Sequence, residues 1–171
     1  MIYTPMKLTF GLSLDGFRPT PGTVAIGELT CGPAGMLDWL ENRQGLRRPA
    51  VTEAQRVAVF RQLLEQAQTG TPRFYTRSFV QDPVAVAETL LGWRDALVLA
   101  GWDGTVPGAA SARLRDLAEV ELLAANALPP GVGDRLRALL HALDRRSDEL
   151  ANVQTMDDPR QLPKLWRLLL A

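Results

Sequence analysis

Apolar and polar residues alternate near the start of the chain. Every second residue from Leu8 to Leu14 is apolar, so these side chains fall on one face of an extended segment, which is typical of a half-buried strand. A second segment, 23–30, begins with β-branched residues and follows a connector rich in proline and glycine. We therefore expect strands at 7–14 and 23–30, and the turn residues between them predict a local hairpin.

From residue 33 onward, apolar residues recur at the three- and four-residue spacing of helices. Three helix starts carry capping signals: Thr52 with Gln55 forms a capping box, Asp82 precedes a proline, and Ser111 precedes a helical repeat. Gly45 is placed to end the first helix. The predicted helices cover about 36–45, 52–68, 82–101, 111–128, 133–146 and 162–170. A short third strand is expected near 152–156.

These elements indicate a helix-rich α/β fold with a small sheet of two or three strands. We expect a single domain, or a fragment of one, over residues 1–171. It contains a strand–strand–helix unit at 1–50, a helical part at 51–148, and a short strand and the start of a helix at 149–171. The last predicted helix is strongly apolar and reaches the end of the sequence, which favours a piece of a longer polypeptide.

The composition is that of an ordinary soluble globular domain. Of the 171 residues, 46% are hydrophobic and 22% are charged, and 19 Lys and Arg balance 19 Asp and Glu. The apolar stretches are shorter than the roughly 18 residues that a membrane-spanning helix needs, and the N-terminus lacks the pattern of a secretory signal. We therefore expect a cytoplasmic protein with no membrane partner. The neutral net charge argues against a strongly basic nucleic-acid-binding domain but leaves room for a local basic patch.

Cysteine and histidine are too scarce for several kinds of site. One cysteine, Cys31, excludes an internal disulfide, and one histidine, His141, excludes zinc sites built from several Cys and His ligands. Together they could form a nucleophile and a base, but no motif links them, and a core cysteine with a surface histidine is the simpler interpretation. Asp157 and Asp158 could bind a metal, although the proline that follows them favours a turn.

The segment 27–35 has part of the glycine spacing of a phosphate-binding loop. Such a loop needs glycines whose amides wrap the phosphates, followed by a lysine and a Ser or Thr. Gly27 and Gly32 have the spacing, but Pro33 and Ala34 stand where the lysine and the hydroxyl belong. The acidic residue two positions before a lysine that marks two-metal nucleases is also missing. We therefore expect a simple turn here, and no catalytic residue, cofactor or metal ligand in the chain.

One group of arginines is a candidate basic patch. Arg43 lies one helical turn before Arg47 and Arg48, and guanidinium groups pair well with phosphates. A solvated face, in which these arginines pair with nearby glutamates, is the alternative interpretation.

A second group of arginines is interleaved with aromatic residues. Arg73 and Arg77 lie within the aromatic segment 73–79, as in surfaces that stack single-stranded bases. Aromatic residues that lead into a helix are also typical of a core. In the helix that follows, Trp93 falls on the apolar stripe and is expected to be buried.

Two stretches of the chain resemble a known family. Residues 32–46 begin Gly-Pro-Ala-Gly-Met-Leu-Asp-Trp-Leu, and residues 74–102 begin Phe-Tyr-Thr-Arg-Ser-Phe and end Leu-Ala-Gly-Trp. Together they are similar to the N-terminal region of AddB-like proteins of the PD-(D/E)XK nuclease superfamily, in which an inactivated helicase half precedes a C-terminal nuclease. The resemblance implies a degenerate P-loop-helicase-like domain with a helical insert at 82–146, and nuclease residues that lie outside this chain.

The resemblance therefore implies a non-catalytic N-terminal domain of a DNA repair or recombination protein, with a DNA-binding or scaffolding role. The partners it implies are DNA, the rest of the parent polypeptide, or a helicase partner subunit. The alternative is a stand-alone protein–protein interaction module that associates through exposed apolar helices such as 162–171. A small-molecule enzyme that uses Cys31 or the 27–35 loop is the third hypothesis.

Overall fold

The computed structural model describes residues 7–16, 27–143 and 153–171. The chain divides into two compact units. Met1–Arg48 and Asp134–Ala171 form the first, here named the sheet unit, and Pro49–Gly133 form the second, here named the helical unit. The helical unit is therefore a continuous insertion in the sequence of the sheet unit. It ends earlier than the predicted helical part at 51–148, because most of the sixth helix belongs with the sheet.

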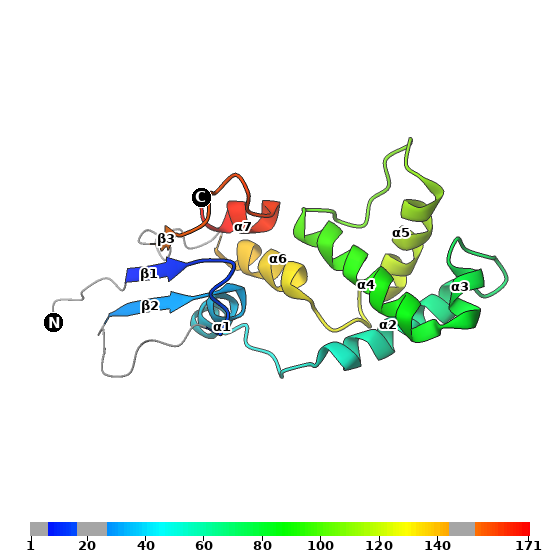
Figure 1. The fold of residues 1–171 in the computed structure, drawn as a ribbon, viewed down its shortest axis with the longest axis horizontal. Coiled ribbons are helices and arrows are strands. Elements are labelled where there is room, and N and C mark those ends of the chain that lie inside the picture. The colour runs from blue at the N-terminus through cyan, green and yellow to red at the C-terminus, as the bar shows by residue number, and fades with distance from the viewer. Residues whose placement is uncertain (1–6, 17–26, 144–152) are drawn as a thin grey trace. The chain divides into compact units, whose positions relative to one another are not determined.

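The sheet unit is built on three short strands, β1 (Lys7–Phe10), β2 (Glu28–Cys31) and β3 (Val153–Thr155). They lie in the order β2-β1-β3, and both pairings are parallel (Figure 1). The predicted hairpin between the first two strands is therefore wrong, since a hairpin pairs its strands antiparallel. The 17 residues that separate β1 from β2 exceed the dozen or so that a parallel crossover requires.

The first strand is shorter than its apolar alternation predicts. It ends at Phe10, and a turn follows in which the Leu14 amide donates to the Gly11 carbonyl at 3.1 Å. Leu12 is 37% exposed, so its apolar side chain does not extend the buried face of the strand. The short third strand near 152–156 is confirmed at Val153–Thr155. Most of the predicted second strand, 23–26, lies outside the described residues.

Three helices complete the sheet unit: α1 (Pro33–Gln44), α6 (Val132–Leu143) and α7 (Lys164–Leu169). Gly45 ends α1 in the left-handed conformation, with φ of 67°, as its position predicts. The last helix ends at Leu169 and not at the last residue, which corrects the predicted extent of 162–170. Trp166 of α7 is buried and stacks on Phe10 of β1, with ring centroids 4.8 Å apart.

An ion pair joins two of these helices. The Arg135 guanidinium of α6 donates to the Glu41 carboxylate of α1 at 2.8 Å through two nitrogens, and to Asp38 at 2.7 Å. The apolar core borders this ion pair, in which Glu41 is buried and Asp38 is exposed. The buried residues of the sheet unit include Leu8, Phe10, Met36, Leu37, Leu40, Leu136, Leu139, Leu162, Leu165 and Trp166.

The helical unit contains α2 (Glu53–Ala67), α3 (Thr76–Gln81), α4 (Pro83–Leu99) and α5 (Ala112–Ala124). The three predicted caps are confirmed. Thr52 and Gln55 form both hydrogen bonds of the capping box, Asp82 accepts from the amide three residues on, and Ser111 does the same for α5. The buried core is Val57, Phe60, Leu63, Leu64, Tyr75, Phe79, Ala87, Leu90, Leu91, Leu117, Val120 and Ala124.

Two arginines are buried inside the helical unit and share one carboxylate. Arg56 donates to both oxygens of Asp95, at 2.7 and 2.9 Å, and Arg94 donates to Asp95 at 3.1 Å. Arg94 also makes two 2.8 Å bonds to Glu121 of α5. A Cβ atom at Gly131 would lie 2.6 Å from the Arg56 guanidinium, so a larger residue here would displace a member of this network.

No helix in the described part of the chain is both long enough and apolar enough to cross a membrane.

Candidate functional site

The carboxyl edge of the parallel sheet is the first place to look for a ligand site, because open α/β sheets bind ligands there. At this edge α1 begins directly after β2, with Gly32 as its N-cap residue. The Asp15 carboxylate accepts from the Ala34 amide, with distances of 3.0 and 3.2 Å to its two oxygens. A helix N-terminus attracts an anion, and here the chain supplies that anion itself.

Gly32 has a steric reason to be glycine. A Cβ atom at this position would lie 2.2 Å from the Asp15 amide nitrogen and 2.4 Å from its Oδ1, so any larger residue would displace the 11–16 turn. The glycine therefore lets the turn after β1 approach the start of α1. These contacts favour the interpretation of segment 27–35 as a structural turn.

A second carboxylate closes the same edge beyond β3. Asp157 accepts from the Leu12 amide at 2.7 Å, and Asp158 accepts from the Arg160 amide at 2.9 Å. Both aspartates therefore hold backbone turns, as the proline after them predicts. Within residues 7–16, 27–143 and 153–171, no group of three or more His, Cys, Asp or Glu side chains is arranged to hold a metal ion.

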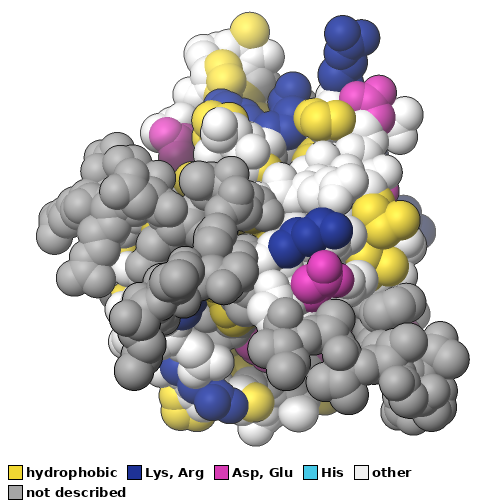
Figure 2. Space-filling view, turned by 90° about the vertical axis from the view of Figure 1, so that its left-hand side faces the viewer, with side chains coloured by type: hydrophobic (Ala, Val, Ile, Leu, Met, Phe, Trp, Pro, Cys, Tyr) yellow, Lys and Arg dark blue, Asp and Glu magenta, His cyan; other side chains and the backbone are white. Residues whose placement is uncertain are grey.

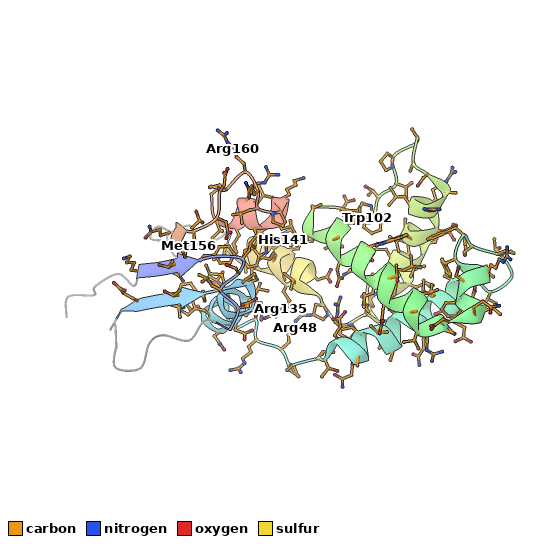
Figure 3. All side chains as sticks on the ribbon, in the orientation of Figure 1. Arg48, Trp102, Arg135, His141, Met156 and Arg160 are labelled. Atoms are coloured by element: carbon orange, nitrogen blue, oxygen red, sulfur yellow. The ribbon has the colours of Figure 1, made fainter. Side chains whose placement is uncertain are left out.

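Cys31 and His141 have different environments. Cys31 is buried at the end of β2, and burial raises the pKa of its thiol, with a further increase from the nearby Asp15 carboxylate. A raised pKa keeps the thiol protonated at neutral pH, which makes it a poor nucleophile. His141 is exposed on α6 (Figure 3).

Arg43, Arg47 and Arg48 are all exposed, at the end of α1 and in the extended segment after it. The Arg43 guanidinium lies 5.1 Å from the centroid of the Trp39 ring, which is a cation–π contact. Arg47 donates to the Asn42 side chain at 3.5 Å. On the face seen in Figure 2, Lys and Arg side chains form separate groups among acidic and neutral ones.

The aromatic segment at 73–79 does not form the predicted stacking surface. Tyr75 and Phe79 are buried in the core of the helical unit, 3% and 5% exposed. Arg73 pairs with Asp116 at 3.2 Å and also with Glu119, which lie 43 and 46 residues further along the chain. Only Arg77, exposed on α3, remains as a candidate contact from this pair of arginines.

The structure instead exposes an aromatic residue that the sequence pattern places in the core. Trp93 of α4 is 46% exposed, so its predicted burial is wrong. Its ring is parallel to that of Phe74 within 5°, with centroids 6.5 Å apart, and the Arg113 guanidinium lies 5.9 Å from the Phe74 centroid. Both Trp93 and Arg113 line hollows in the surface of the helical unit.

No family model, curated protein or solved structure matches the chain.

Proposed function

We propose that this chain is a non-catalytic part of a DNA repair or recombination protein, which contacts the DNA backbone through Arg43, Arg47 and Arg48. The observation that carries the proposal is the exposure of these three guanidinium groups within one short stretch of the chain. Arginine forks suit phosphate oxygens, and such contacts position a protein on nucleic acid without reading its sequence.

The distribution of charge between the two units supports a DNA contact on the sheet unit, which contains the three arginines. The sheet unit carries 12 Lys and Arg against 10 Asp and Glu, whereas the helical unit carries 7 against 9. Four arginines outside this stretch form ion pairs with carboxylates. This applies to Arg56 and Arg94 with Asp95, to Arg73 with Asp116, and to Arg135 with Glu41.

The carboxyl edge of the sheet supports the non-catalytic part of the proposal. The Asp15 carboxylate accepts a hydrogen bond from the Ala34 amide at the N-terminus of α1, and the Asp157 carboxylate accepts one from the Leu12 amide in the turn after β1. A bound phosphate would have to displace the Asp15 carboxylate and overcome its negative charge. A scaffold with a closed edge fits this arrangement better than a nucleotide-hydrolysing domain.

The test is fluorescence anisotropy with labelled single-stranded and forked DNA at about 50 and 200 mM salt. Replacement of the three arginines by alanine removes three phosphate contacts, so the slope of log K against log salt should fall by about 2 for single-stranded DNA. A matched variant removes three exposed arginines from other places, including the outward-pointing Arg160 (Figure 3). This control replaces Arg115, Arg160 and Arg167 by alanine.

Two outcomes would overturn the proposal. If the wild-type protein does not bind DNA at micromolar concentration, the proposed direct contact with DNA is wrong. Equal salt slopes for the test variant and the control variant would place the contacts elsewhere.

The alternative function, a protein–protein interaction module, was predicted from an exposed apolar helix at 162–171, and the structure does not show that surface. Segment 162–171 does not present an exposed apolar helix, because Leu165, Trp166 and Leu169 are buried in the sheet unit. Only Leu168 of α7 exposes a large apolar side chain, with 54% of its surface accessible. Any partner surface has to be sought on another element.

A further inference from the structure

The helical unit carries a surface groove that the proposed DNA contact does not use. It consists of two adjoining hollows of about 340 and 430 Å³, the first between α3 and α4 and the second between α4 and α5. Trp93 and Arg113 line both hollows and so connect them. We call this surface the Trp93 groove.

The aromatic part of the groove is held in place before any ligand arrives. Phe74 lies against Trp93 on a parallel plane, and Arg113 contacts the Phe74 ring. The backbone amide of Phe74 is fixed by the Asp116 carboxylate at 2.9 Å. An exposed tryptophan on a rigid support is the kind of residue that dominates binding energy in protein interfaces, because little side-chain freedom is lost on binding.

The hollow between α4 and α5 is lined mainly by apolar side chains. Ala96 and Leu97 contribute from α4, and Leu114 and Leu117 contribute from α5. The Ser111 hydroxyl at its rim already accepts from the Leu114 amide as the N-cap of α5. A ligand in this hollow would therefore bury apolar side chains and would find few neutral hydrogen-bonding groups.

Charge narrows the choice of occupant. Among the described residues that line the two hollows, Arg113 is the one with a formal charge, and its side chain is exposed. It therefore favours a ligand that places an acidic group beside an apolar one. A nucleic-acid strand fits less well, because the helical unit has 9 acidic against 7 basic residues and would repel a run of phosphates.

We propose that the Trp93 groove docks an amphipathic segment of a partner protein. Apolar side chains of that segment enter the α4–α5 hollow and cover Trp93, while a carboxylate beside them pairs with Arg113. This is the groove mode of peptide recognition, in which apolar anchors recur at helical spacing. The proposal does not depend on the DNA contact, which involves arginines of the other unit.

The test uses the full chain and three labelled probes. The first is a synthetic helical peptide with leucines at i, i+3, i+4 and i+7 and glutamates elsewhere, the second replaces its glutamates by lysines, and the third is oligo(dT). We expect the acidic peptide to bind at least tenfold more tightly than the lysine peptide.

Substitutions assign the binding to the groove. Arg113→Glu should lower the affinity for the acidic peptide by about tenfold or more and raise the affinity for the lysine peptide. Trp93→Ala should lower the affinity for both peptides. Arg115→Glu is the matched control, since it makes the same charge change two residues away, at an exposed position of α5 that does not line the hollows. Circular dichroism checks that each variant keeps its helices.

Three outcomes would overturn the proposal. The acidic peptide fails to bind the wild type, it binds Arg113→Glu as well as it binds the Arg115→Glu control, or oligo(dT) alone binds in a Trp93-dependent way. The last result would assign the groove to single-stranded nucleic acid.

Discussion

The two units of the molecule stabilise their interiors by different means. In the sheet unit, the stacked rings of Trp166 and Phe10 are 1% and 0% exposed, and the buried charge among the described residues is a single carboxylate, Glu41, 7% exposed, which pairs with the half-buried Arg135. In the helical unit, two guanidinium groups are themselves buried, 6% exposed at Arg56 and 5% at Arg94. A buried charge is tolerated only with its partner, whereas a buried ring needs only close packing. We therefore expect the sheet unit to be destabilised most by the loss of close packing, and the helical unit by the loss of a charge partner.

The largest effect is expected from Trp166→Ala. Removal of a fully buried aromatic side chain leaves a cavity against Phe10, which should lower the free energy of unfolding by about 4 kcal/mol. Hydrogen exchange read by segment should show the loss of protection in the sheet unit. Leu168→Ala, on the same helix but 54% exposed, should change stability by less than about 0.5 kcal/mol. An equal loss of protection in α2 and α4 would contradict the idea of separate interiors.

A slightly smaller effect is expected from Asp95→Ala in the helical unit. This change leaves both buried guanidinium groups without one of their carboxylates and should cost about 3 kcal/mol. Chemical denaturation of the variant measures that cost, with Glu88→Ala, an exposed position on the same helix, as the control. A cost no greater than that of the control would show that Arg56 and Arg94 do not need the shared carboxylate.

The smallest effect concerns alkaline pH. Burial raises the pKa of Tyr75 to about 12 from an ordinary 10.0, and its hydroxyl donates to the Leu64 carbonyl at 3.1 Å. The folded state thus holds this proton more tightly than the unfolded state does. The resulting stability is fully present below pH 10 and is lost as the pH rises toward 12. Stability curves for wild type and Tyr75→Phe should converge over this range, and parallel curves would contradict the assignment.

Features set by neighbouring residues were predictable from the sequence. The capping box of Thr52 and Gln55, the Asp82 and Ser111 caps and the left-handed Gly45 each depend on groups within a few residues. The direction of strand pairing was not predictable, because it depends on a crossover and not on the turn residues after β1. The extent of α7 was close to its prediction, but its burial depends on Phe10, at the other end of the chain.

The candidate site residues likewise divide into those whose environment depends on neighbouring residues and those whose environment depends on distant ones. The exposure of Arg43, Arg47 and Arg48 follows from their place at a helix end, whereas the partners of Arg73 lie 43 and 46 residues away. Trp93 shares a helical stripe with core residues of α4, so its periodicity predicts burial. It is exposed because α5 does not cover that part of α4 and a hollow remains between them.

The position of β1 in the middle of the sheet has a consequence for synthesis. Its first neighbour, β2, follows soon after it, but Phe10 pairs with Thr155, 145 residues later. At about 5–20 residues per second, roughly 7–30 s of translation separate these two events. The helical unit emerges completely in that interval, while one edge of β1 stays open. A chain interrupted before β3 would keep that edge unpaired and available to other strands, which makes β3 a safeguard against aggregation.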